Sequence, residues 1–182
     1  MSAPTQQLYE QTLVLRSQVG DEQAFQELLA LYGPHLLRFT RRMMQTQPQL
    51  VEDVTQEIWV AIYRGLPRLL DTAKFRPWAF RIARDRIYRE YRRRKIALEP
   101  LEESQIEDST ADGEAYAVDS EALQRGLGAL SPEHREVLML CYFEEMSYEE
   151  IAGVTRSTLG TVRSRIHYAK RALKSALERK TL

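Results

Sequence analysis

Apolar side chains recur every three or four positions along most of this chain, and no stretch alternates apolar and polar residues. A spacing of three or four places apolar side chains on one face of a helix, whereas alternation would place them on one face of a strand. Glycine and proline are sparse between these segments. The pattern therefore predicts an all-α protein.

Cap and turn residues divide this pattern into separate helices. Asp, Ser and Thr cap helices, and proline suits the first helical turn because its missing N–H would be unpaired there anyway. Ser147 and Glu150 also have the spacing of a capping box. Helix starts are predicted at Asp21, Pro34, Val51, Pro77, Ser131, Ser147 and Thr158. The helix from Val51 is expected to end at Leu66, and that from Pro77 at Lys95.

The last predicted helix, Thr158–Lys174, has two distinct faces. One is apolar (Val162, Ile166, Ala169, Leu173), and the opposite one is polar or basic (Ser164, His167, Tyr168, Arg171). Residues 156–174 contain six basic residues and no acid. A solvated surface helix could show the same faces. The capped helix before it and the turn Thr155–Ser157 favour a helix-turn-helix that reads the major groove of DNA.

Charge is distributed unevenly, although the formal net charge is zero. Residues 21–95 carry 15 Lys/Arg against 9 Asp/Glu, residues 96–122 carry 9 acids and no base, and residues 123–182 carry 10 bases against 7 acids. Local charge governs association with polyanions. The acidic segment Leu98–Asp119, poor in apolar residues, is predicted to be a flexible linker, and an acidic strip that docks on a basic surface is the alternative. The division is 1–20 (N-terminal extension), 21–96, 97–120 (linker) and 121–182.

The composition argues against several classes of protein. Cys141 is the single cysteine, the three histidines lie in separate segments, and no acid/base or metal-ligand constellation surrounds them. We therefore expect neither an enzyme nor a bound cofactor or metal. The sequence has no apolar run of the roughly 20 residues that span a bilayer and no signal-peptide pattern at its start. A cytoplasmic location without membrane insertion is expected.

Two faces in the first half suggest binding. The helix Val51–Leu66 has a polar side with Asp53, Glu57 and an exposed Val60, which suits docking on a basic protein and fits a solvated face equally well. The segment Arg76–Lys95 carries nine basic and two acidic residues interleaved with aromatics. Cations contact phosphates and flat rings stack on unpaired bases, so this segment is typical of single-strand binding.

Four segments in order resemble the bacterial sigma factors of the extracytoplasmic-function class, the two-domain group of the sigma-seventy family. They are GDEQAFQELLALYGPHLLRF, VEDVTQEIWVAIYR, FRPWAFRIARDRIYREYRRRK and LSPEHREVLMLCYFEEMSYEEIAGVTRSTLGTVRSRIHYAKRAL. The resemblance implies a region 2 helical bundle over 21–96 and a region 4 helix-turn-helix over 121–182. It also implies three partners: the clamp and flap of core RNA polymerase, promoter DNA, and an anti-sigma factor.

The resemblance also implies roles for individual residues. Those implied to contact core polymerase are Asp53, Gln56, Glu57 and Val60. The loop Gly65–Phe75 and a helix face would open and read the minus-ten element; the residues on that face are Arg81, Arg84, Asp85, Tyr88 and Arg92. Those implied to contact the minus-thirty-five element are Arg163, Ser164, Arg165, His167, Tyr168, Lys170 and Arg171. Three positions depart from the family pattern: Asp85 (often Asn), Arg156 (usually Gly) and Tyr168 (often basic).

Two other functions remain open from the sequence. A helix-turn-helix regulator would bind duplex DNA without polymerase and would not use a strand-capturing helix. A protein-interaction module would leave both basic faces incidental.

Overall fold

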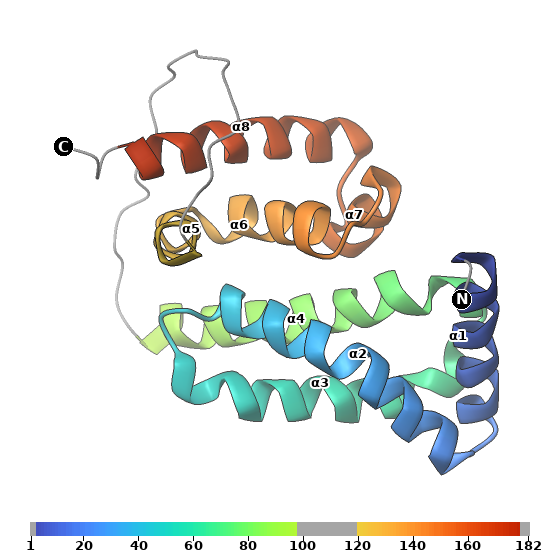
Figure 1. Ribbon diagram of the computed structural model, residues 1–182. Coiled ribbons are helices and arrows are strands. Elements are labelled where there is room, and N and C mark those ends of the chain that lie inside the picture. The colour runs from blue at the N-terminus through green and yellow to red at the C-terminus, as the bar shows by residue number, and fades with distance from the viewer. Residues whose placement is uncertain (1–2, 98–119, 179–182) are drawn as a thin grey trace.

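The computed structural model describes residues 3–97 and 120–178, and those residues form helices and turns but no strand. The prediction of an all-α protein is therefore confirmed. Figure 1 shows two layers, with α1–α4 in one and α5–α8 in the other. The predicted linker Leu98–Asp119 lies outside the described residues.

The first layer is the N-terminal unit and the second is the C-terminal unit. The N-terminal unit consists of α1 (Ala3–Gln18), α2 (Glu22–Met43), α3 (Val51–Gly65) and α4 (Phe75–Ala97), with the short 3₁₀ turns η1 (Pro48–Leu50), η2 (Leu66–Arg68) and η3 (Thr72–Lys74). The C-terminal unit consists of α5 (Ser120–Gly128), α6 (Pro132–Leu138), the π-helical segment η4 (Met139–Phe143), α7 (Tyr148–Thr155) and α8 (Leu159–Glu178).

Helix α2 corrects one prediction, because it passes through Pro34 instead of ending before it. Asp21 caps the helix as expected, since its Oδ1 accepts from the backbone N–H of Ala24 at 3.0 Å. Proline inside a helix costs about 3 kcal/mol. Buried side chains lie on both sides of it, including Leu28 and Leu36 with no exposed surface. Each such side chain contributes about 1.5–3 kcal/mol, so packing outweighs the lost hydrogen bond.

The other helix limits in the N-terminal unit lie close to the predicted ones. Helix α3 ends at Gly65, one residue before the expected Leu66. Helix α4 begins at Phe75, two residues before Pro77. Pro77 therefore lies within the first turn, where backbone N–H groups have no intrahelical acceptor and the ring is tolerated.

Helix α1 is an element that the sequence interpretation did not assign, because it treated residues 1–20 only as an extension. Its Leu13 and Val14 are buried against the rest of the unit. Figure 1 shows α1 across one end of this unit, beside the ends of α2 and α4. Helix α1 therefore forms part of the N-terminal core.

The predicted caps of the C-terminal unit are confirmed. The Ser131 hydroxyl accepts from the backbone N–H of His134, and Ser147 and Glu150 form both hydrogen bonds of a capping box. The Thr158 hydroxyl accepts from the N–H of Thr161 at 3.2 Å. Helix α8 thus begins as predicted and continues to Glu178, one turn beyond Lys174.

The turn between α7 and α8 places Arg156 where glycine is commonest. Its backbone is left-handed, with φ 52° and ψ 46°. The N–H of Ser157 donates to the carbonyl of Ala152 at 3.1 Å, which closes the end of α7. The tight turn therefore forms although a side chain in this conformation costs about 1–2 kcal/mol.

The two units pack against each other chiefly through α4 and α7. At one end of this contact Arg135 is buried, and its guanidinium donates to the Met43 carbonyl at the end of α2 at 2.9 Å. It also donates to the carbonyls of Leu127 and Gly128 at the end of α5 and of Leu130 just after it. One charged side chain thus joins the units.

Candidate protein- and nucleic-acid-binding surfaces

The outer face of α3, termed the α3 surface, carries all four residues expected to contact a partner protein. They are Asp53, Gln56, Glu57 and Val60, and each is exposed. The inner face of α3 is buried and consists of Val51, Val54, Ile58 and Ile62. The helical period therefore brings the four expected residues together on one side.

Two arginines of α4 border this surface. The Glu57 carboxylate pairs with Arg89 and lies 3.7 Å from the Nη1 of Arg86. Because these ion pairs hold Glu57 against α4, the exposed carboxylate of Asp53 carries the negative charge at the outer edge.

Sequence reasoning missed Tyr63 on the α3 surface. Its side chain is 56% exposed, and Val60 one helical turn earlier is 47% exposed. The Tyr63 ring packs edge-on against Phe25 of α2, with centroids 5.0 Å apart. The i, i+3 spacing from Val60 was the available signal. The surface thus combines an acidic edge with an apolar and aromatic end.

The residues of α4 expected to contact the minus-ten element lie mostly against the C-terminal unit. The Arg84 Nε is 2.8 Å from the Glu136 Oε1, and the Tyr88 hydroxyl donates to Glu136 Oε2 at 3.2 Å. Arg156 donates to the Asp85 carboxylate at 3.0 Å. Of this set, Arg81 lines a cleft and Arg92 is exposed. The structure therefore brings Arg84, Asp85 and Tyr88 to the seam between the units.

Glu136 is a buried acid at this seam, with no exposed surface. Burial raises its pKa to about 7, and the adjacent Arg84 charge and the Tyr88 hydroxyl only partly oppose that increase. Burial also raises the pKa of Tyr88 above its ordinary value, so this phenol stays protonated and donates. Glu136 thus pairs with a cation and a phenol, Arg84 and Tyr88, that the family resemblance predicted to contact DNA.

A second buried acid, Glu144, is held by the N-terminal unit. Its Oε2 lies 2.8 Å from the Nδ1 of His35, and its Oε1 lies 3.5 Å from Arg38. Arg76 donates to its backbone carbonyl. Next to it, the Arg42 guanidinium lies 3.8 Å from the centroid of the Phe143 ring. At Glu136 and at Glu144 the C-terminal unit therefore supplies the acid and the N-terminal unit the bases.

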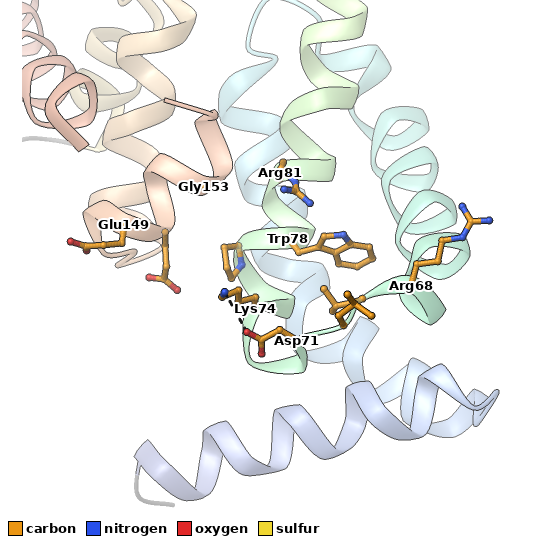
Figure 2. A pocket seen from close by; sticks show the side chains of 11 residues that line it. Arg68, Asp71, Lys74, Trp78, Arg81, Glu149 and Gly153 are labelled. Atoms are coloured by element: carbon orange, nitrogen blue, oxygen red, sulfur yellow. Dashed lines mark ion pairs between the residues drawn. The ribbon is translucent and has the colours of Figure 1, made fainter. Parts of the chain in front are cut away.

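The loop after α3 borders a cleft of about 660 Å³ between the two units. Figure 2 shows Arg68, Asp71, Lys74, Trp78 and Arg81 of the N-terminal unit along this cleft and Glu149 and Gly153 on α7, where in this view the Glu149 side chain points away from the N-terminal unit. The Lys74 ammonium pairs with Asp71 at 3.4 Å. The basic and aromatic lining suits a nucleic-acid strand, whereas the acids of α7 oppose one.

Trp78 is half-buried, which is intermediate between a core residue and a free stacking platform. Its ring lies so close to the end of α3 that a Cβ on Gly65 would lie 2.9 Å from the ring atom Cζ2. Trp78 therefore fixes where the loop leaves α3.

The outer face of α8, termed the α8 surface, carries the residues expected to contact the minus-thirty-five element. Arg163, Ser164, His167, Tyr168 and Lys170 are exposed, and Arg165 and Arg171 are half-buried. The apolar stripe lies inward, with Val162, Ile166 and Ala169 buried. The Lys170 ammonium lies 5.1 Å from the centroid of the Tyr142 ring. The exposed members form a basic and polar face, and Arg165, whose charge reaches Glu136 and His134 of α6, lies at its inner border.

Two further observations concern only the described residues. Residues 3–97 and 120–178 contain no group of three His, Cys, Asp or Glu side chains placed to hold a metal ion. Among the same residues, no helix has the length and apolar character needed to cross a membrane.

Two profiles of one protein family match the chain. The profile of sigma-70 region 2 matches residues 28–96, and that of sigma-70 region 4 matches residues 120–173. Together they cover most of both units and leave all of α1 unmatched.

The chain is similar in sequence to extracytoplasmic-function (ECF) RNA polymerase sigma factors of several bacteria. SigE of Mycolicibacterium smegmatis is 32% identical over 167 residues, which cover 87% of this chain and 64% of that protein. SigL of Mycobacterium tuberculosis is 35% identical over 156 residues, which cover 82% of this chain and 88% of that protein. The sigma factor RpoE of Bartonella quintana, solved with the anti-sigma factor NepR, has the same fold: its TM-score is 0.70 at 23% identity, covering 85% of this chain and 96% of that one.

Proposed function

Because this chain belongs to the sigma-70 family of RNA polymerase sigma factors, in its extracytoplasmic-function class, we propose that its two units divide promoter recognition between them. A sigma factor is not an enzyme; it binds core RNA polymerase and directs initiation at promoters. The N-terminal unit acts as region 2, which binds core polymerase and captures the opened minus-ten strand. The C-terminal unit acts as region 4, which reads the minus-thirty-five duplex.

The α3 surface is the proposed contact with the polymerase clamp. Its Asp53 carboxylate and its apolar Val60 and Tyr63 are exposed on one helix face. An interface of this kind combines an apolar centre, which supplies affinity, with a charge at the rim that orients the partner. The acidic edge therefore requires a basic partner surface.

The loop Gly65–Phe75 and α4 form the proposed minus-ten site. Arg68, Lys74 and Arg81 supply cations along the cleft, and Trp78 supplies a flat ring. An opened strand needs both, because phosphates bind cations and unpaired bases stack on aromatic rings.

The α8 surface is the proposed minus-thirty-five site. In a helix-turn-helix the second helix lies in the major groove and its first turns meet the base edges. Arg163, Ser164 and His167 lie in the first half of α8, and Lys170 and Arg171 follow them toward the flanking phosphates. Arg163 can form the bidentate contact that arginine makes with guanine.

The packing of the two units against each other affects when α4 can bind the promoter strand. Glu136 and Arg156 contact Arg84, Tyr88 and Asp85 in this structure. The same α4 atoms cannot bind a strand at the same time. The units therefore separate when the factor engages polymerase and promoter, and the arrangement described here is that of the unbound factor.

We also propose a cytoplasmic location and a second protein partner, an anti-sigma factor. Core polymerase and promoter DNA are in the cytoplasm, and a factor that directs initiation works there. The anti-sigma partner follows from the family, one of whose members was solved with such a protein.

This proposal rests on the match of sigma-70 regions 2 and 4, in that order, to two units that expose the α3 and α8 surfaces. Run-off transcription with purified core polymerase and a randomised promoter library tests it. Transcripts should start at a common pair of sequence elements only when the protein is added. A protein that neither binds core polymerase nor directs any start would contradict the proposal.

Two substitutions separate the proposed surfaces. Asp53→Arg reverses the charge of the acidic edge and should weaken core binding at least about tenfold.

Arg163→Ala should lower promoter-specific transcription about 10-fold while core binding stays unchanged, because one bidentate base contact contributes about 1–3 kcal/mol. Loss of core binding in Arg163→Ala would indicate that α8 has a function other than reading the minus-thirty-five element. Tight, specific duplex binding without polymerase would instead indicate an independent regulator.

A further inference from the structure

Gln18, the last residue of α1, is bonded to the loop of the proposed minus-ten site. Its Nε2 donates to the carbonyl of Leu66 at 2.9 Å and to the carbonyl of Leu69 at 2.7 Å. Both partners are acceptors only, so the NH₂ end of the amide must face them. The two carbonyls lie at the start and just after the end of η2. One side chain therefore clamps both ends of this turn.

The end of α1 is itself held firmly. Leu13 and Val14 bury one face of the helix, as described above. Gly20 follows with φ +92°, a backbone conformation that glycine adopts without strain. The Arg16 side chain pairs with Asp21, the cap of α2, at 2.8 Å. Gln18 thus projects from a fixed support toward the loop.

The loop has few backbone hydrogen bonds of its own. Within η2 the Leu69 N–H donates to the Leu66 carbonyl at 3.0 Å, and the next such bond joins Lys74 to Asp71. Leu70 lies between them with a fully exposed side chain. The Gln18 amide therefore fixes the direction in which the chain leaves Leu69 toward Leu70 and the cleft.

We propose that Gln18 is a positioning residue for minus-ten recognition, acting through the loop and not on DNA. This inference rests on the proposed function of the loop. Correctly placed loop atoms favour one base over another, whereas a loop free to move tolerates several. Residue 18 lies in α1, outside residues 28–96 that the region 2 profile matches.

The test measures base preference and not total activity. Transcription with core polymerase uses a promoter library with a fixed minus-thirty-five element and a randomised minus-ten element, and transcripts are sequenced. Gln18→Leu removes both N–H donors and leaves an apolar side chain that is one bond shorter. The matched control is Gln6→Leu, which removes the same group from the same helix, where it bonds only Glu10. A loop variant, Arg68→Ala with Leu70→Ala, tests the proposed function separately.

We expect Gln18→Leu to reduce discrimination at the base that the loop reads by about fivefold, the equivalent of one net hydrogen bond. Core binding and minus-thirty-five preference should not change, and Gln6→Leu should match the wild type. Gln18→Lys keeps N–H donors and should restore much of the preference.

Three outcomes oppose this expectation in different ways. A uniform loss of transcription with an unchanged base profile would reduce Gln18 to a stabilising residue and overturn the inference. An unchanged profile in Gln18→Leu, with an altered one in the loop variant, would overturn it and leave the proposed function intact. An unchanged profile in the loop variant as well would remove the minus-ten role of the loop itself.

Discussion

Asp85 and Arg156 are two positions that depart from the family pattern, and their side chains meet at 3.0 Å across the seam. An acid replaces the frequent Asn, and a left-handed Arg replaces the usual Gly. The left-handed backbone costs about 1–2 kcal/mol, and an exposed ion pair returns at most about 1 kcal/mol. The pair is therefore better explained by its place between the units than by local stability.

A charge swap tests this residue pair. Asp85→Arg places two arginines together and should weaken the contact between the units, and adding Arg156→Asp should restore it. In urea unfolding, a double-mutant cycle should give a coupling free energy of about 0.5–1 kcal/mol. Additive effects of the two changes would show that the contact contributes nothing.

The buried acid Glu136 predicts a pH dependence. Its pKa is about 7 in the folded protein and 4.5 as the ordinary value. Because the folded state holds this proton more tightly, its contribution is fully present below about pH 4.5 and is lost as pH rises to about 7. Relative to Glu136→Gln, the wild type should lose roughly 1–3 kcal/mol of unfolding free energy across that range.

Charged neighbours on two elements bear on this prediction. Arg84 of α4 and Arg165 of α8 both lower the pKa of Glu136, so they oppose the effect of burial. Chemical unfolding from pH 5 to pH 8 checks the result. A constant difference between the wild type and Glu136→Gln would place the titration of Glu136 at its ordinary pKa.

At the scale of elements, Pro34 in the middle of α2 predicts a simple gain in stability. Its side chain is exposed, so Pro34→Ala loses little packing and restores an N–H donor to the helix. The gain should be about 1–2 kcal/mol after allowing for the greater freedom of alanine in the unfolded chain. Thermal unfolding measures it. No gain would indicate that α2 is already bent around the ring.

The helices that the sequence predicted best are those with a cap at their start. Ser147 with Glu150 and Thr158 mark their helices through side-chain bonds to neighbouring N–H groups, which are local interactions. Pro34 misled because its local signal was overridden by burial of Leu28 and Leu36, which depends on distant partners.

The residues of the candidate surfaces likewise include some that local sequence could predict and some that depend on distant partners. The helical period predicted most of the residues that share the α3 and α8 surfaces, and the family resemblance added Lys170. It could not predict that Arg84 and Tyr88 meet Glu136, because that contact joins residues 48 or more positions apart. The hydrogen bonds of Gln18 could not be predicted either, because its acceptors are backbone carbonyls, which every residue has.

At the scale of the whole molecule, the contacts of Glu144 predict a substitution that separates the two units. Glu144→Lys places a cation among His35, Arg38 and Arg76 and should drive the units apart. Small-angle scattering should show a larger radius of gyration. Binding of a single-stranded oligonucleotide with the minus-ten element should increase about 3–10-fold, because α4 becomes accessible.

The neighbouring residue supplies the control for this prediction. Glu145 is exposed, so Glu145→Lys makes the same change in charge without entering the seam. Equal gains in both variants would mean that net charge alone attracts the oligonucleotide. A compact Glu144→Lys protein would show that the acid does not hold the units together.

The Arg135 guanidinium lies between the carbonyl ends of α2 and α5, which are the negative poles of two helix dipoles. When the units part, water takes its place at the Met43 carbonyl, and water is nearly as good a donor. The charge and carbonyl contacts of the seam therefore exchange partners with solvent at low cost, and the apolar core that runs through both units supplies the rest of the contact. The charged part should weaken with salt, which suits a subunit that must be captured, used and released within one round of transcription.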